Sequence, residues 1–261
     1  MKKYWKNGTK RMAVILGAVL LTAVWLAGAF SVKAAETVPS FDVSRFILPE
    51  EAKMLVVVEG NEGSTCQVYA YEKTDGGWEQ RLQTMGIMGR NGMNNNRRVG
   101  DKTTPIGLFQ LNTPFGQSDP QEGFPADYIK VGKRHVWSDL TNRLVEDASV
   151  EGEHVGTKGY QGYYDYALDA GFNVNAIPDQ GSALFLHCWK VGRVDTSGCV
   201  AIPKEQMAYI MKLYGMYGKG ACYIAQAPRD TFELVYDSYG VNGGLSPQGD
   251  FSRPGVQSIA N

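Results

Sequence analysis

Histidine and cysteine are scarce in this 261-residue chain, which has three histidines, four cysteines and no Cys-x-x-Cys pair. A structural zinc site takes four such ligands at close spacing, so the composition argues against zinc. Four cysteines in so long a chain also argue against a small scaffold held by disulfides. The sequence shows no internal repeat, and we interpret its main part as one domain.

Long hydrophobic runs are lacking except near the N-terminus, where residues 12–30 are uncharged and almost wholly apolar. Five basic residues precede this run, and Val32-Lys33-Ala34 presents small or apolar groups where a signal peptidase cuts. We therefore expect residues 1–34 to be a signal peptide. An uncleaved anchor is the alternative, because the run is nearly long enough to span a bilayer. Both predict export to the cell envelope, and membrane contact through this segment is expected only if it stays uncleaved.

An excess of positive charge is also lacking. Residues 1–34 hold six of the 26 Lys and Arg residues and none of the 27 Asp and Glu residues. The remainder therefore has 20 basic and 27 acidic residues, a formal net charge of −7. Proteins that bind nucleic acid present a basic surface to the phosphates, so we expect no nucleic-acid partner.

The residues that are present favour β-structure, since glycine and aromatic residues are plentiful. Residues 54–60 have the pattern of a buried strand, and two alternating runs separated by a turn at residues 74–77 predict a β-meander. Residues 112–134 have the Pro and Gly content of a loop. Residues 204–214 show helical spacing, with Gly215 as the expected stop. Further strands are expected at residues 108–111, 181–189, 198–203 and 220–228.

The predicted organisation has three parts after the signal segment. Residues 35–50 form a polar linker, and residues 51–228 form one mostly β domain with one or two short helices. Residues 229–261 are rich in Gly, Ser and Pro and are expected to be a loosely ordered polar tail.

The stretch LFLHCWKVGRVDTSGCVAIP, residues 184–203, brings a histidine and two cysteines close together. A thiolate needs a cationic or dipolar neighbour, and a histidine on an adjacent strand can take the thiol proton. The amides of Ser197, Gly198 and Cys199 can converge as an oxyanion hole. The residues alone leave open a Cys188–Cys199 disulfide, or a buried structural cysteine beside a core histidine.

Two motifs give the chain a family resemblance. The sequence GSALFLH ending at His187, followed by TSGCVAI around Cys199, resembles the L,D-transpeptidase catalytic domain, also called the YkuD-type domain. Thr104-Pro105-Ile106-Gly107-Leu108-Phe109 resembles that family's second hallmark. The likeness covers residues 54–226 and implies a mixed β-sandwich or barrel-like fold. Ser197 departs from the family pattern, which has histidine there in its most familiar form.

The resemblance implies an exported, cysteine-dependent peptidoglycan L,D-transpeptidase that acts on stem peptides. Cys199 would attack the carbonyl before the terminal D-Ala of a tetrapeptide stem, leaving a thioester that a second stem amine resolves as a 3→3 cross-link. His187 would be general base and then acid, oriented by the Cys188 carbonyl. The family uses no metal or organic cofactor, so none is expected.

Several alternatives remain open from the sequence. The same acyl-enzyme resolved by water would make the protein an L,D-carboxypeptidase, and an inactive site would make it a wall-binding module. Arg193 and Trp189 are candidate substrate contacts, against a solvated arginine and a core tryptophan. Cys66 and Cys222 form either a disulfide or two buried thiols. We expect a monomer.

Overall fold

The computed structural model describes residues 38–239, and residues 39–239 of it belong to one compact unit. The signal or anchor expected at residues 1–34, and the end of the expected tail at residues 240–261, lie outside the described residues. Between residues 38 and 239 the structure contains no helix with the length and apolar character that a membrane crossing requires.

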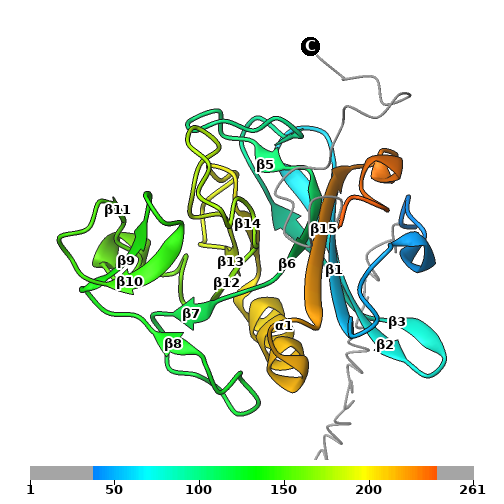
Figure 1. Ribbon diagram of the computed structural model, residues 1–261, viewed down its shortest axis with the longest axis horizontal. Coiled ribbons are helices and arrows are strands. Elements are labelled where there is room, and N and C mark those ends of the chain that lie inside the picture. The colour runs from blue at the N-terminus through cyan, green and yellow to red at the C-terminus, as the bar shows by residue number, and fades with distance from the viewer. Residues whose placement is uncertain (1–37, 240–261) are drawn as a thin grey trace, which may run out of the picture. The chain divides into compact units, whose positions relative to one another are not determined.

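A mixed sheet of ten strands curls into a half-barrel (Figure 1), in the order β6-β15-β1-β2-β3-β14-β13-β12-β7-β8. The prediction of a mostly β, barrel-like fold is confirmed. The strands of this sheet are β1 (Met54–Gly60), β2 (Thr65–Thr74), β3 (Gly77–Ile87), β6 (Gly107–Gln110), β7 (Pro114–Gly116), β8 (Ile129–Lys130), β12 (Ala167–Asp169), β13 (Phe185–Cys188), β14 (Val200–Ile202) and β15 (Cys222–Pro228).

Smaller elements complete the fold. A two-stranded sheet and a three-stranded sheet lie outside the half-barrel, and the described residues contain a single α-helix with three short 3-10 turns. Their bounds are β4 (Met93–Asn94), β5 (Thr104–Pro105), β9 (His135–Ser138), β10 (Arg143–Glu146), β11 (Gly152–Glu153), α1 (Lys204–Tyr217), η1 (Val43–Arg45), η2 (Lys158–Tyr160) and η3 (Phe232–Leu234).

The meander β1–β2–β3 forms as the alternating sequence predicts, and every residue of β1 is buried. Burial on both faces explains the continuous apolar run of β1. Val56 and Val58 belong to the core that β1 shares with α1, whereas Leu55 and Val57 face a second core on the other side. Figure 1 shows α1 between the β1–β15 side and the β12–β13 side of the curled sheet.

The helix does not stop at Gly215. It continues to Tyr217 and ends at Gly218, whose φ is +74° and whose N–H bonds to the Tyr214 carbonyl. Gly215 serves a different purpose, because a Cβ there would lie 2.4 Å from the carbonyl oxygen of Gly123. The glycine therefore permits close packing of a loop against the helix rather than ending it.

The segments expected as a linker and as a loose tail pack against the domain where they are described. Phe41 and Phe46 lie against Phe232, and Tyr236 joins the same core on the outer face of β1, β2 and β15. The backbone N–H of Ile47 donates to the carbonyl of Tyr236 at 2.7 Å. Aromatic side chains thus order residues 38–50 and 229–239, although their overall composition is polar.

All four cysteines are free thiols. Cys66 pairs with Gly60 at one end of β1, and Cys222 pairs with Met54 at the other end. Six residues of strand separate these positions, about 20 Å, whereas a disulfide needs Cα atoms within about 7 Å. Cys66 and Cys222 are therefore two buried thiols and not a disulfide.

Residues 112–134 were expected to be loop, but they contribute the short strands β7 and β8 to the edge of the large sheet. The three-stranded sheet of β9, β10 and β11 follows in the chain. It packs on β13 through a cluster in which Trp137 and Phe185 meet with ring centroids 4.7 Å apart. This small sheet places Glu153, its last residue, beside the end of β13 that carries the histidine.

Candidate active site

His187 and Cys199 face one cavity because of strand geometry. β13 and β14 run parallel with His187 opposite Ala201, and Cys199 precedes Ala201 by two positions. Side chains two apart in an extended chain point to the same face, so Cys199 and His187 share a face. The cavity has a volume of about 400 Å³. Its lining includes Arg97, Glu153, Tyr160, Tyr163, Tyr164, Ser182, Ala183, His187, Lys190, Arg193, Asp195, Ser197 and Cys199.

Cys199 is a partly buried thiol with defined backbone partners. Its Sγ accepts the N–H of Phe185 at 3.4 Å and donates to the carbonyl of Ala183 at 3.4 Å. Burial raises the pKa of the Cys199 thiol to about 12, and the charge of Glu153 adds to the rise, while the Phe185 N–H and Arg97 act in the opposite direction. The thiol is therefore protonated at rest and needs a base before it can act as a nucleophile.

His187 is suited to be that base. Its side chain is buried, and its Nδ1 lies 2.9 Å from the Cys188 carbonyl oxygen, as the sequence motif predicts. Burial lowers the pKa of His187 to about 4, although the carbonyls of Cys188 and Tyr163 oppose that shift. The ring is thus neutral near pH 7. Since Nδ1–H donates to the carbonyl, Nε2 carries the free lone pair.

The backbone before Cys199 is held by hydroxyl groups. The Thr196 hydroxyl donates to the Cys199 carbonyl at 2.6 Å and accepts the Gly198 N–H at 3.0 Å. The Gly198 amide was expected to serve the oxyanion hole, but in this conformation it is engaged by Thr196. The amide of Ser197, the third residue of the expected hole, belongs to the same loop, and Ser197 itself lines the cavity.

Gly198 has a conformation that only glycine adopts easily, with φ +137°. A Cβ at this position would lie 2.8 Å from the Thr103 carbonyl oxygen. The Thr104 hydroxyl donates to the Gly198 carbonyl at 2.8 Å and accepts the N–H of Gly89 at 2.9 Å. Thr104 begins the second sequence motif, so that motif supports the loop that precedes Cys199.

Arg97 is a buried cation behind the same loop. Its Nε donates to the Thr103 carbonyl at 2.9 Å, its Nη1 donates to the Gln180 carbonyl at 2.7 Å, and its Nη2 lies 3.5 Å from the Ser197 carbonyl. Burial lowers the pKa of Arg97. The sequence reasoning missed this residue, since it lies in a Gly- and Asn-rich stretch that has the pattern of a loop.

Three tyrosines and a glutamate form another part of the cavity wall. Tyr160 stacks on Tyr164 with ring centroids 5.1 Å apart, and Tyr164 meets the His187 ring edge-on at 5.3 Å. Tyr164 also donates its hydroxyl to the Glu153 carboxylate. Burial raises the pKa of Glu153 to about 7 against the effect of this hydrogen bond. The many aromatic residues of residues 160–166 are a feature of the sequence that could have indicated this wall. Glu153 has no such feature in the sequence around it.

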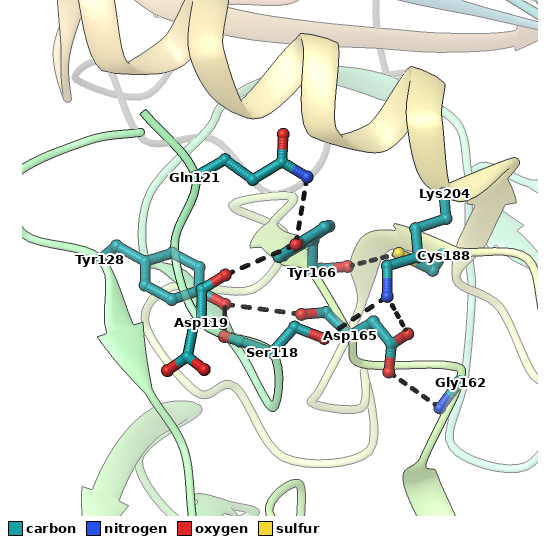
Figure 2. Close-up of polar contacts among 9 residues, drawn as sticks. All are labelled: Ser118, Asp119, Gln121, Tyr128, Gly162, Asp165, Tyr166, Cys188 and Lys204. Atoms are coloured by element: carbon teal, nitrogen blue, oxygen red, sulfur yellow. Dashed lines mark hydrogen bonds and ion pairs between the residues drawn. The ribbon is translucent and has the colours of Figure 1, made fainter. Parts of the chain in front are cut away.

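The tyrosine segment is anchored from behind by the network in Figure 2. The Asp165 carboxylate accepts the N–H of Gly162 at 3.1 Å and pairs with the Lys204 ammonium at 2.6 Å. The Cys188 thiol donates to the Tyr166 carbonyl at 3.5 Å. Figure 2 shows Cys188 directed toward this network at the start of α1. Cys188 follows His187 on β13, so its side chain lies on the other face of the strand, and it is not among the residues that line the cavity.

The two candidate substrate contacts are placed differently. Arg193 lines the cavity and its guanidinium lies 6.0 Å from the ring centroid of Tyr163. Trp189 is not among the lining residues, but its indole N–H donates to the Arg193 carbonyl at 2.9 Å. Between residues 38 and 239, no three His, Cys, Asp or Glu side chains are grouped so that they could hold a metal ion.

The half-barrel carries a candidate site in which a cysteine and a neutral histidine, from the ends of neighbouring parallel strands, line one cavity. A sequence model of the YkuD family, described as the L,D-transpeptidase catalytic domain, matches residues 53–217, and the chain belongs to this family. No curated protein matches the chain significantly. The resemblance seen in the two motifs is thus confirmed, and the family places the protein in cell-wall chemistry.

Proposed function

We propose that the protein is an exported, monomeric L,D-transpeptidase that forms 3→3 cross-links between peptidoglycan stem peptides. The observation that carries the proposal is the shared cavity of Cys199 and His187, with the imidazole hydrogen-bonded to the Cys188 carbonyl at 2.9 Å. That hydrogen bond leaves Nε2 as an acceptor, which is the state a general base requires.

In the first half-reaction, Nε2 of His187 takes the thiol proton as the sulfur of Cys199 attacks the carbonyl between the diamino acid and D-Ala. The amides of Ser197 and Cys199 stabilise the oxyanion, an effect of about 10²–10³-fold for each donor. The tetrahedral intermediate then expels D-Ala, whose nitrogen takes the proton from His187. A thioester remains, and Arg193 at the cavity rim is suited to bind a carboxylate of the stem peptide.

In the second half-reaction, the side-chain amine of another stem peptide attacks the thioester carbonyl. His187 receives a proton from the attacking nitrogen and returns it to the departing sulfur, so the enzyme is regenerated as a thiol. Proton transfer by a positioned base contributes about 10²–10⁴-fold. If water replaces the amine, the product is a tripeptide and the protein is an L,D-carboxypeptidase.

The test is release of D-Ala from disaccharide-tetrapeptides by the purified protein, with mass spectrometry of the remaining products. We expect a cross-linked dimer from the wild type and no D-Ala release from Cys199→Ala. Cys222→Ala is the matched control, since Cys222 is a free thiol on β15 outside the cavity. Full activity of Cys199→Ala would exclude the mechanism. Tripeptide without dimer would assign the hydrolytic reaction, and binding to peptidoglycan without D-Ala release would indicate a wall-binding module.

A further inference from the structure

Two carboxylates line the cavity, and the proposed mechanism uses neither. Asp195 pairs with Arg90 at 3.0 Å, whereas Glu153 has no ion pair among the described residues. Glu153 ends β11, where it pairs with Trp137 of β9, so the small three-stranded sheet holds its backbone in place. Its side chain is partly buried and lines the cavity together with Cys199. The negative charge of Glu153 acts on the Cys199 thiol, which shows that the two groups are electrostatically close.

The surroundings of Glu153 contain hydrogen-bond donors but no cation. Tyr164 and Tyr160 donate to the carboxylate from the segment after β11. Asp139, from the loop after β9, adds a further negative charge near Glu153. Cys199 interacts with Glu153 from the loop before β14. Among the ion pairs of residues 38–239, none involves Glu153.

The remaining charges of the cavity lie elsewhere in its lining. Lys190 and Arg193 come from the loop between β13 and β14, and Arg97 lies behind the nucleophile loop. The cavity therefore has a cationic rim, suited to carboxylates, and an acidic wall at Glu153. A partly buried carboxylate without a cation is costly, and a cationic ligand relieves that cost.

The proposed reaction brings such a ligand to the cavity, because the acyl acceptor carries an amine that is a cation in water. We propose that Glu153 binds the ammonium group of the acyl acceptor and so favours an amine over water as the second substrate. The bound ammonium passes one proton to the Glu153 carboxylate, which releases it to water, and the neutral amine then attacks the thioester. This inference rests on the proposed function of Cys199. Glu153 would then be a specificity residue that comes from the small three-stranded sheet rather than from either sequence motif.

Glu153→Gln tests the inference, because the amide oxygen still accepts the tyrosine hydroxyls while the charge is lost. The readout is the ratio of cross-linked dimer to tripeptide made from disaccharide-tetrapeptides. We expect this ratio to fall roughly 10- to 100-fold, the range for losing a hydrogen bond between charged groups. Alkylation of Cys199 by iodoacetamide, followed by peptide mass spectrometry, should become faster, since removal of the negative charge lowers the pKa of the thiol.

The pH dependence gives a second readout that a structural role would not produce. In both proteins the dimer-to-tripeptide ratio should rise with pH as the acceptor amine loses its proton. The wild type should show an additional rise as Glu153 ionises near pH 7, and Glu153→Gln should lack it. Glu146→Gln is the matched control, since Glu146 lies on β10 of the same small sheet, is exposed and is not among the lining residues.

Two results would overturn the inference. Equal slowing of iodoacetamide alkylation and of dimer formation in Glu153→Gln would show that the residue only supports the fold of the site. Slower D-Ala release with an unchanged dimer-to-tripeptide ratio would show that Glu153 binds the donor peptide instead. Failure of the proposed function itself is distinguishable, because the wild type would then release no D-Ala.

Discussion

The guanidinium of Arg97 joins three backbone segments behind the Cys199 loop, and its removal is a direct test of how that loop is held. Arg97→Met keeps much of the side-chain volume but leaves the carbonyls of Thr103 and Gln180 without their donors. An unsatisfied buried carbonyl costs about 1–3 kcal/mol, so two cost about 2–6 kcal/mol. Because the burial of the guanidinium is itself unfavourable, we expect a net loss of about 2–4 kcal/mol.

The same substitution should change the reactivity of Cys199. The positive charge of Arg97 lowers the pKa of this thiol, so its loss raises the pKa further and reduces the thiolate at a fixed pH. We expect alkylation by iodoacetamide at pH 9 to be slower than in the wild type, because less of the thiol is ionised.

Urea unfolding followed by tryptophan fluorescence measures the stability, and mass spectrometry of the Cys199 peptide measures alkylation. Arg97→Lys is the companion variant. It keeps the charge but not the fork of donors, so it should lose stability while retaining most of the thiol reactivity. An unchanged urea midpoint together with an unchanged alkylation rate in Arg97→Met would refute the reasoning.

Two further predictions concern stability. Gly198→Ala should lower the free energy of unfolding by at least 1–3 kcal/mol, about the cost of a strained φ, plus the clash with the Thr103 carbonyl. Gly63→Ala, at φ +73° with open space around it, should cost only about 1 kcal/mol; equal losses would contradict the clash. Burial raises the pKa of Asp169 to about 7, because the folded protein favours the protonated carboxyl. The contribution of Asp169 to the free energy of unfolding is therefore largest below about pH 4 and is lost as the pH rises to 7. Asp169→Asn keeps an acceptor for the Gly171 N–H and should be more stable than the wild type at pH 8, by on the order of 3 kcal/mol; a lower stability at pH 8 would contradict this.

The sequence predicted the parts of the site that follow from local pattern. Apolar runs located β1, β13 and β15, and the motif around His187 and Cys199 indicated two side chains that line one cavity. The carbonyl partner of His187 was also expected, because the resemblance to the family implies that the next residue, Cys188, orients the imidazole. Alternation along the strands then explains why Cys188 turns away from the cavity while His187 faces it.

The parts that were not predicted depend on contacts between distant segments. Arg97 contacts Ser197, which is 100 positions away in the sequence. Glu153 lines the cavity because the small three-stranded sheet packs on β13. Neither residue has a local pattern that distinguishes it from a solvated charge. Gly215 likewise has the sequence pattern of a helix stop. Only the structure shows that the loop at Gly123 packs closely against it.

The central claim is that Cys199 is the nucleophile of an acyl-transfer site. Treatment with meropenem, a carbapenem, followed by mass spectrometry of the intact protein and of its peptides tests this claim most directly. The account predicts one covalent adduct, located on the Cys199 peptide, with the buried thiols Cys66, Cys188 and Cys222 unmodified and no adduct on Cys199→Ala. An unmodified wild-type protein, or an adduct on another cysteine, would contradict it.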